Sequence, residues 1–227
     1  MKQLALDLSP YADPSFSNFV TGANAELVYA LQSLAVGERV ERFVYLWGGP
    51  GSGRSHLLAA TSAASRNAQL LRAPLRAEQL DAVSPGALLA LDDVDQLDAL
   101  AQGSLFRLYN RMRDTSGVLI ASGPLAPGGL AVRADLATRL SWGLVYQVHA
   151  LNDTDKSAAM GERAAAHGFT LPLEARDYVL RHCRRDLPSL LALVDLLDRY
   201  SLETKRAVTL PLVREVMKLS LANTASR

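Results

Sequence analysis

The sequence predicts an α/β fold in which a phosphate-loop core holds a parallel five-stranded sheet and an all-helical lid follows. Short apolar runs alternate with helical patterns as far as about Leu151, which is typical of a parallel sheet with crossover helices. A glycine-rich turn joins the first apolar run to a helix, as in proteins that hold a phosphate at a helix N-terminus. Beyond Leu151 only helical patterns remain, so the lid is expected to contain no strand.

The predicted strands are short apolar runs. Residues 43–47 combine aromatic and aliphatic side chains, which suits a buried strand. Residues 87–91 contain no polar side chain, as expected for a strand that is covered on both faces. The other strands are predicted at residues 70–71, 118–121 and 144–148.

Helices are expected between these strands. Asn24 is suited to cap the first, which runs to about Ala35. Its apolar face comprises Leu27, Leu31 and Leu34. A second helix opens near Arg54, and two more are predicted at residues 96–113 and 134–140.

The lid is predicted to be built from helices at residues 153–167, 172–182, 186–201 and 209–220. A proline lies near the start of the last three, where its missing N–H costs least: Pro172, Pro188 and Pro211. The chain is therefore expected to divide into a flexible leader (1–15), an α/β nucleotide-binding core (16–151) and a helical lid (152–227).

Composition narrows the class of protein. Lys and Arg total 24 and Asp and Glu total 23, so the net charge of +1 disfavours a broad nucleic-acid-binding surface. Cys183 is the only cysteine, which excludes an internal disulfide and suits a reducing compartment. No stretch approaches the roughly 20 apolar residues needed to cross a bilayer, and the N-terminus lacks a signal-peptide core. We expect a soluble cytoplasmic protein without a membrane partner.

The glycine-rich turn matches the G-x-x-x-x-G-K-[ST] phosphate loop except that Arg54 replaces the lysine. Glycines let several backbone N–H groups converge on one anion, and the helix N-terminus adds partial positive charge. The predicted phosphate-binding residues are Gly48, Gly49, Pro50, Gly51, Ser52, Gly53, Arg54 and Ser55. Because a planar guanidinium differs from a lysine point charge, binding should tolerate the replacement better than catalysis. The alternative is a glycine-rich turn with no ligand.

An acidic pair closes the third strand. In a phosphate-loop protein, the first carboxylate, here Asp92, helps to hold Mg²⁺ together with the Ser55 hydroxyl, and the second, Asp93, can orient a water. Ser122 follows the fourth strand at the same sheet edge and is a candidate sensor of the γ-phosphate. The alternatives are helix-capping acids and a surface turn serine.

Three arginines are candidates for contacts with phosphates. Arg139 precedes the last strand, where it is suited to reach the nucleotide of a neighbouring molecule and stabilise transition-state charge, and Arg133 competes for that role. Arg185 begins a lid helix and is suited to fold onto the nucleotide. A solvated surface position is the alternative for each of them.

These motifs, taken in order, resemble the DnaA-related AAA+ family, and in particular its Hda branch of regulatory inactivators. The resemblance covers nearly the whole chain from Phe16 onward. It is carried by residues 19–24, by the loop ending in Arg54-Ser55-His56, and by 91–93, 139–143 and 185–187. A short connection between the second and third strands, and a chain that ends after the lid without a DNA-binding domain, favour Hda over DnaA itself.

The resemblance implies roles for these residues. Arg139 matches an arginine finger that acts in trans, and Arg185 matches the second sensor. Ser122 matches the first sensor only loosely, because Gly123 stands where an aspartate is usual. The implied nucleotide is ADP or ATP with Mg²⁺, and the implied contacts at the adenine pocket and the loop include Phe19, Val20, Asn24 and His56.

The leader resembles the peptide by which Hda and other partners dock on the DNA polymerase sliding clamp. Alternating leucines can enter an apolar groove while a glutamine makes polar contacts. The matching residues are Gln3, Leu4, Leu6 and Leu8. Asp7 stands where a proline is common, and the alternative is a disordered or strand-adding N-terminus.

The leading hypothesis is a negative regulator of replication initiation that binds the DNA-loaded clamp and stimulates ATP hydrolysis by DnaA. On this interpretation the chain has little or no catalysis of its own and contacts DNA only through the clamp; a homo-oligomer is an open alternative. A second hypothesis is an ATP-hydrolysing remodeller or helicase loader. A third is an adaptor without a functional nucleotide site.

Overall fold

A computed structural model describes residues 13–38 and 40–224 of the chain. It separates into two compact units, one formed by Asp13–Ala150 and the other by the described residues from Leu151 onward. Each unit has a hydrophobic core of its own. Among the described residues, no helix is long and apolar enough to cross a membrane.

The first unit is built on a parallel five-stranded sheet, which confirms the predicted fold class. The strands are β1 (Phe43–Trp47), β2 (Ala68–Arg72), β3 (Leu88–Asp92), β4 (Val118–Gly123) and β5 (Leu144–Gln147). They lie in the sheet in the order β2-β3-β4-β1-β5, so β1, which precedes the glycine-rich turn, lies between β4 and β5. Because the strands run the same way, their carboxyl ends meet at one edge, where the glycine-rich turn, the acidic pair and Ser122 lie.

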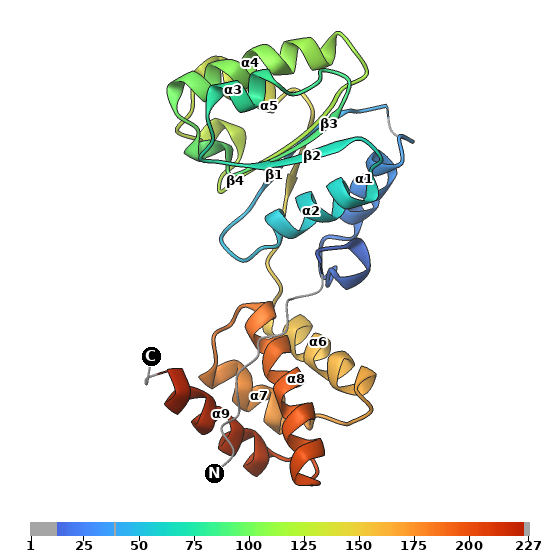
Figure 1. Cartoon of the computed structure of the whole chain (residues 1–227), viewed down its shortest axis with the longest axis vertical. Helices are drawn as coiled ribbons and strands as arrows, with labels where there is room; N and C mark the ends of the chain where they lie inside the picture. The colour runs from blue at the N-terminus through green and yellow to red at the C-terminus, as the bar shows by residue number, and fades with distance from the viewer. Residues whose placement is uncertain (1–12, 39, 225–227) are drawn as a thin grey trace. The chain divides into compact units, whose positions relative to one another are not determined.

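Helices cover both faces of the sheet (Figure 1). One face carries α1 (Ala25–Ala35) and α2 (Arg54–Ala64). The other face carries α3 (Ala77–Asp81), α4 (Ala99–Arg113) and α5 (Ala134–Leu140). The strand alternation explains the two cores, since successive side chains of one strand point to opposite faces. Short 3₁₀ turns complete the unit at Phe16–Asn18, Val94–Gln96 and Pro127–Gly129.

Two helical predictions need correction. The helix expected from residue 96 starts only at Ala99, because the Asp98 side chain caps it by accepting from the Ala101 N–H at 2.8 Å. Asn24 precedes α1, but its side chain makes no cap hydrogen bond to that helix. The short helix α3 was not predicted at all, because five residues are too few to show a helical period.

The second unit is a bundle of α6 (Asp153–Ala166), α7 (Leu173–His182), α8 (Leu187–Thr204) and α9 (Leu210–Thr224). Side chains cap two of these helices: Asn152 accepts from the Asp155 N–H at 2.8 Å, and Asp186 from the Ser189 N–H at 2.9 Å. An Arg163–Asp195 ion pair at 2.7 Å joins α6 to α8. These helices pack around a core of buried aliphatic side chains contributed by all of them.

Candidate nucleotide site

The glycine-rich turn connects β1 directly to α2, and the backbone of the turn requires glycine at two of its positions. Gly51 and Gly53 adopt φ values of +74° and +103°, a region that disfavours side chains. A Cβ on Gly53 would also lie 2.8 Å from Cε2 of Phe19, so the loop approaches the adenine-pocket segment closely. The Ser52 N–H donates to the Gly49 carbonyl at 3.2 Å, which closes the turn.

Two polar atoms of the loop are buried without a hydrogen-bond partner. They are Oγ of Ser52 and Nη1 of Arg54. Buried polar groups are almost always satisfied, so each such atom calls for an explanation. Unused hydrogen-bonding capacity at a turn of this shape is what an anionic ligand would satisfy.

The segment predicted to line an adenine pocket packs beside the loop. The Phe19 and His56 rings lie 5.3 Å apart between centroids, and His56 Nε2 is 2.9 Å from the Ser15 carbonyl. The Asn24 side chain bonds the backbone of His149, after β5, with its amide 2.9 Å from the His149 oxygen and its own oxygen 2.8 Å from the His149 nitrogen. Val20 is half-buried in the same segment. Asn24 therefore fixes the segment to the end of the sheet and does not cap α1.

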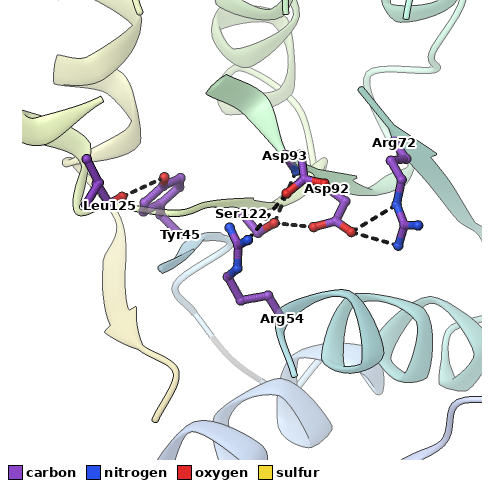
Figure 2. A network of polar contacts seen from close by, with 7 residues as sticks. All are labelled: Tyr45, Arg54, Arg72, Asp92, Asp93, Ser122 and Leu125. Carbon is purple, nitrogen blue, oxygen red and sulfur yellow. Dashed lines mark hydrogen bonds and ion pairs between the residues drawn. The ribbon is translucent and has the colours of Figure 1, made fainter. Parts of the chain in front are cut away.

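The carboxyl ends of β2, β3 and β4 bring three polar side chains together (Figure 2). Asp92 is only 1% exposed, and its Oδ1 accepts from the Ser122 hydroxyl at 2.5 Å. Its Oδ2 accepts from Nε and Nη2 of Arg72 at 3.1 and 2.9 Å. Both oxygens of this carboxylate are therefore occupied by protein donors.

These contacts decide the charge state of the buried carboxyl. Burial alone would raise the pKa of Asp92, but the Ser122 and Ser55 hydroxyls and the Arg72 guanidinium outweigh that effect. The pKa of Asp92 lies below its ordinary value as a result. The group remains an anion, and its charge is balanced by Arg72.

Asp93 has a different environment. Its backbone is left-handed, with φ 56° and ψ 52°, and its N–H donates to Oγ of Ser122 at 3.3 Å. Burial and then the negative charge of Asp92 raise the pKa of Asp93, while the Arg54 guanidinium, 3.4 Å away, opposes the rise. Arg54 thus contacts the residue that was expected to orient a water.

The predicted Mg²⁺ ligands fit that metal poorly. Mg²⁺ requires oxygen ligands in near-octahedral geometry at about 2.0–2.1 Å. A metal on Asp92 would have to share Oδ1 with the Ser122 hydroxyl, or Oδ2 with the Arg72 guanidinium, whose positive charge repels a cation. Arg72 was missed at the sequence level, although it pairs in register with Asp92 once β2 and β3 are aligned.

Tyr45 explains the glycine at position 123. Its hydroxyl donates to the Leu125 carbonyl at 2.9 Å, and burial raises its pKa well above the ordinary value (Figure 2). A Cβ on Gly123 would lie only 2.2 Å from this hydroxyl oxygen. A side chain at that position, such as the aspartate that is usual there, would require Tyr45 to move, and Ser122 supplies the polar side chain at the end of β4.

Arg139 lies between two aromatic rings and outside the carboxylate network. Its guanidinium carbon is 3.8 Å from the Trp142 ring centroid and 5.2 Å from that of Phe106. Its Nε is buried without a hydrogen-bond partner, whereas Trp142 is 54% exposed. The competing Arg133 is instead held by Asp135 at 2.7 Å. Of these two candidates, Arg139 is the one that forms no ion pair with a carboxylate in the part of the chain that the structure describes.

The remaining predicted residues belong to other parts of the chain. Arg185 lies in the second unit, in the connection between α7 and α8 and not in the predicted helix itself, where it forms an ion pair with Asp153. The clamp-peptide residues Gln3, Leu4, Leu6 and Leu8 lie outside the described residues.

Comparisons with known proteins agree with this architecture. Residues 153–217 match the family model described as the Hda lid domain. Domain III of DnaA from Thermotoga maritima superposes with a TM-score of 0.70 at 20% identity, covering 90% of this chain and 95% of that one.

Two further structures show the same fold. AMPPCP-bound DnaA from Aquifex aeolicus gives a TM-score of 0.70 at 20% identity, covering 87% of this chain and 68% of that one. A Thermotoga maritima RuvB variant gives 0.71 at 16% identity, covering 91% and 72%. The sheet and helices of the first unit, followed by the helical lid, therefore have the AAA+ architecture of DnaA and RuvB.

Proposed function

We propose that this chain is a regulator of replication initiation that stimulates ATP hydrolysis by DnaA. The proposal starts from the lid match and the fold, which support an Hda-like, DnaA-related AAA+ protein. The observation that carries the proposal is the contrast between its arginines. Arg54 and Arg72 are paired with Asp93 and Asp92, whereas Arg139 is held by aromatic rings alone.

The chain's own nucleotide, ADP or ATP, has a structural role in this proposal. Unpartnered atoms of Ser52 and Arg54 line the phosphate turn, which favours an anionic ligand. AMPPCP-bound DnaA shares the fold. The contact between Arg54 and Asp93 disfavours hydrolysis, because Asp93 would have to orient an attacking water while paired with a cation.

Arg139 acts on DnaA as an arginine finger in trans. A finger places a delocalised positive charge on the transferred phosphoryl group, and this accelerates hydrolysis by about 10³–10⁵ in GTPases. The rings of Phe106 and Trp142 hold the guanidinium plane without neutralising it. Such a residue is oriented before the partner arrives, so less entropy is lost on contact.

Docking to the sliding clamp through Gln3, Leu4, Leu6 and Leu8 completes the proposal. A clamp-bound peptide raises the local concentration of the regulator near DnaA on DNA without new contacts to DnaA. The sequence of the leader is the support for this step.

The test measures turnover of ATP bound to DnaA in the presence of clamp, DNA and this protein. Arg139→Ala should remove the stimulation, and Arg133→Ala, which breaks only a surface ion pair, should retain it. Unchanged stimulation by Arg139→Ala would remove the finger assignment. Gln3→Ala with Leu4→Ala should weaken capture by the clamp but leave nucleotide binding intact.

The rival function is an ATP-hydrolysing remodeller or helicase loader. It requires steady hydrolysis by the purified protein that Asp93→Asn abolishes. The pairing of Asp93 with Arg54 predicts that this activity is absent or very slow.

A further inference from the structure

Arg72 ends β2 beside the acidic edge of the site, on the carboxylate that phosphate-loop proteins use for a metal. Two of its N–H groups donate to the same oxygen of Asp92, from Nε at 3.1 Å and Nη2 at 2.9 Å. The carboxylate is 1% exposed, whereas the Arg72 side chain is 62% exposed. The arginine therefore reaches from the surface onto a buried anion.

The charges at this edge are balanced by protein groups. A buried carboxylate is costly unless a cation pairs with it, and Arg72 supplies that cation to Asp92. Arg54 lies against the second carboxylate, with Nη2 at 3.4 Å from Asp93. An ordinary phosphate loop neutralises the same region with a lysine and a divalent cation.

A metal on Asp92 would have to share an oxygen that already accepts hydrogen bonds. Oδ2 of Asp92 faces two guanidinium donors, and Oδ1 holds the Ser122 hydroxyl at 2.5 Å. Loss of Ser122 would also remove the acceptor of the Asp93 N–H. A metal on Oδ2 would either displace Arg72, at the cost of charge-assisted hydrogen bonds, or lie beside its positive charge, and a metal on Oδ1 would share that oxygen with the Ser122 hydroxyl.

We propose that Arg72 takes the place of the divalent cation in this site, so that the chain binds a nucleoside diphosphate without Mg²⁺. A guanidinium suits this role because it can hold a carboxylate and still present N–H groups to phosphate oxygens. The inference rests on the nucleotide binding proposed above and specifies its cation requirement. It also accounts for a nucleotide that is retained and not hydrolysed.

The experiment is calorimetry of ADP binding to the full chain, stripped of nucleotide, in EDTA and in excess MgCl₂. The affinity of the unaltered protein should agree within about twofold between the two buffers, which is about 0.4 kcal/mol. Arg72→Gln should bind about tenfold more weakly in EDTA, as expected for the loss of one charge-assisted contact, and MgCl₂ should restore the affinity.

Arg66→Gln is the matched control. Arg66 is exposed in the turn before β2, at the opposite edge of the sheet, so its replacement makes the same change in charge away from the site. Its affinity for ADP should match that of the unaltered protein in both buffers.

Mn²⁺ gives a readout that does not depend on nucleotide affinity. By electron paramagnetic resonance, the nucleotide-free protein should hold no ordered Mn²⁺ at this edge, whereas Arg72→Gln, with Oδ2 of Asp92 released, should acquire one.

The outcomes separate the two proposals. ADP binding by the unaltered protein that requires Mg²⁺ would overturn the role of Arg72 but leave nucleotide binding in place. Absence of ADP binding in both buffers would overturn nucleotide binding itself, and the role of Arg72 with it. The affinities of the unaltered protein for ADP in EDTA and in MgCl₂ test whether binding requires Mg²⁺, even if Arg72→Gln does not fold.

Discussion

Removing the Ser122 hydroxyl should destabilise the α/β unit strongly for so small a change. Ser122 is fully buried, donates to Asp92 at 2.5 Å and accepts from the Asp93 N–H at 3.3 Å. A hydrogen bond to a charged group contributes about 1.5–3 kcal/mol and a neutral one about 1 kcal/mol. Ser122→Ala should therefore lower the free energy of unfolding by about 3 kcal/mol, a large share of the roughly 5–15 kcal/mol of a typical domain.

The loss should depend on pH with a definite sign. The folded-state pKa of Asp92 lies below its ordinary value, so this carboxylate contributes stability above the unfolded-state pKa and loses it as pH falls through the folded-state pKa. Without the Ser122 hydroxyl, burial raises the folded-state pKa and part of that contribution is lost at neutral pH. The difference in the free energy of unfolding between variant and parent should thus be largest near neutral pH. It should shrink at acid pH, once Asp92 is protonated in both proteins.

The assay is urea unfolding followed by tryptophan fluorescence at neutral and acid pH. Both tryptophans of the chain, Trp47 and Trp142, lie in the α/β unit, so the signal reports this unit and not the lid. Ser141→Ala is the control, since its exposed hydroxyl bonds only a carbonyl of its own helix and should cost under about 0.5 kcal/mol. A loss below about 1 kcal/mol for Ser122→Ala, or one that does not change with pH, would refute the reasoning.

Two further predictions concern close contacts at the site. Gly123→Ala should destabilise the α/β unit by about 1–3 kcal/mol, because the new Cβ would lie 2.2 Å from the Tyr45 hydroxyl. Adding Tyr45→Phe removes that atom and should recover part of the loss in the same urea assay; a double variant no more stable than Gly123→Ala would contradict the steric account. Trp142→Ala should lower stimulation of DnaA by about 2–30-fold, since the stacking of Arg139 contributes about 0.5–2 kcal/mol. Trp142→Phe should retain most of the stimulation, and equal rates for the two variants would exclude a positioning role for the ring.

The order of strands and helices was predictable because it depends on local patterns. Buried strands such as β3 appear as uninterrupted apolar runs, here residues 87–91, and the phosphate turn is marked by glycines that the backbone requires at positive φ. The edge strand β2 was predicted only in part, at residues 70–71, because its exposed positions include the polar residues Gln69 and Arg72, which interrupt the apolar run.

The contacts that specify the site were less accessible to sequence reasoning. Asp92 and Ser122 were expected at one sheet edge, but their partner Arg72 depends on the register of β2 against β3, which no local pattern encodes. The close approach of the Tyr45 hydroxyl to Gly123, which leaves no room for a Cβ, likewise involves residues 78 positions apart. It depends on the pairing of β1 with β4. Sequence patterns identify which residue types meet at a parallel sheet edge, whereas pairings across the sheet decide which of them neutralise one another.

This distinction bears on how a phosphate-loop fold changes from hydrolysing a nucleotide to retaining it. Catalysis needs a carboxylate free to hold a metal and another free to orient water. Here the glycines of the turn are kept, while Arg72 and Arg54 contact the two carboxylates at 2.9 and 3.4 Å. On the proposals made above, these two contacts would disable the metal and water positions without altering the backbone of the phosphate turn. A site modified in this way would keep its ligand as part of the structure, and the chemistry that we propose the protein promotes would then occur on a partner's nucleotide.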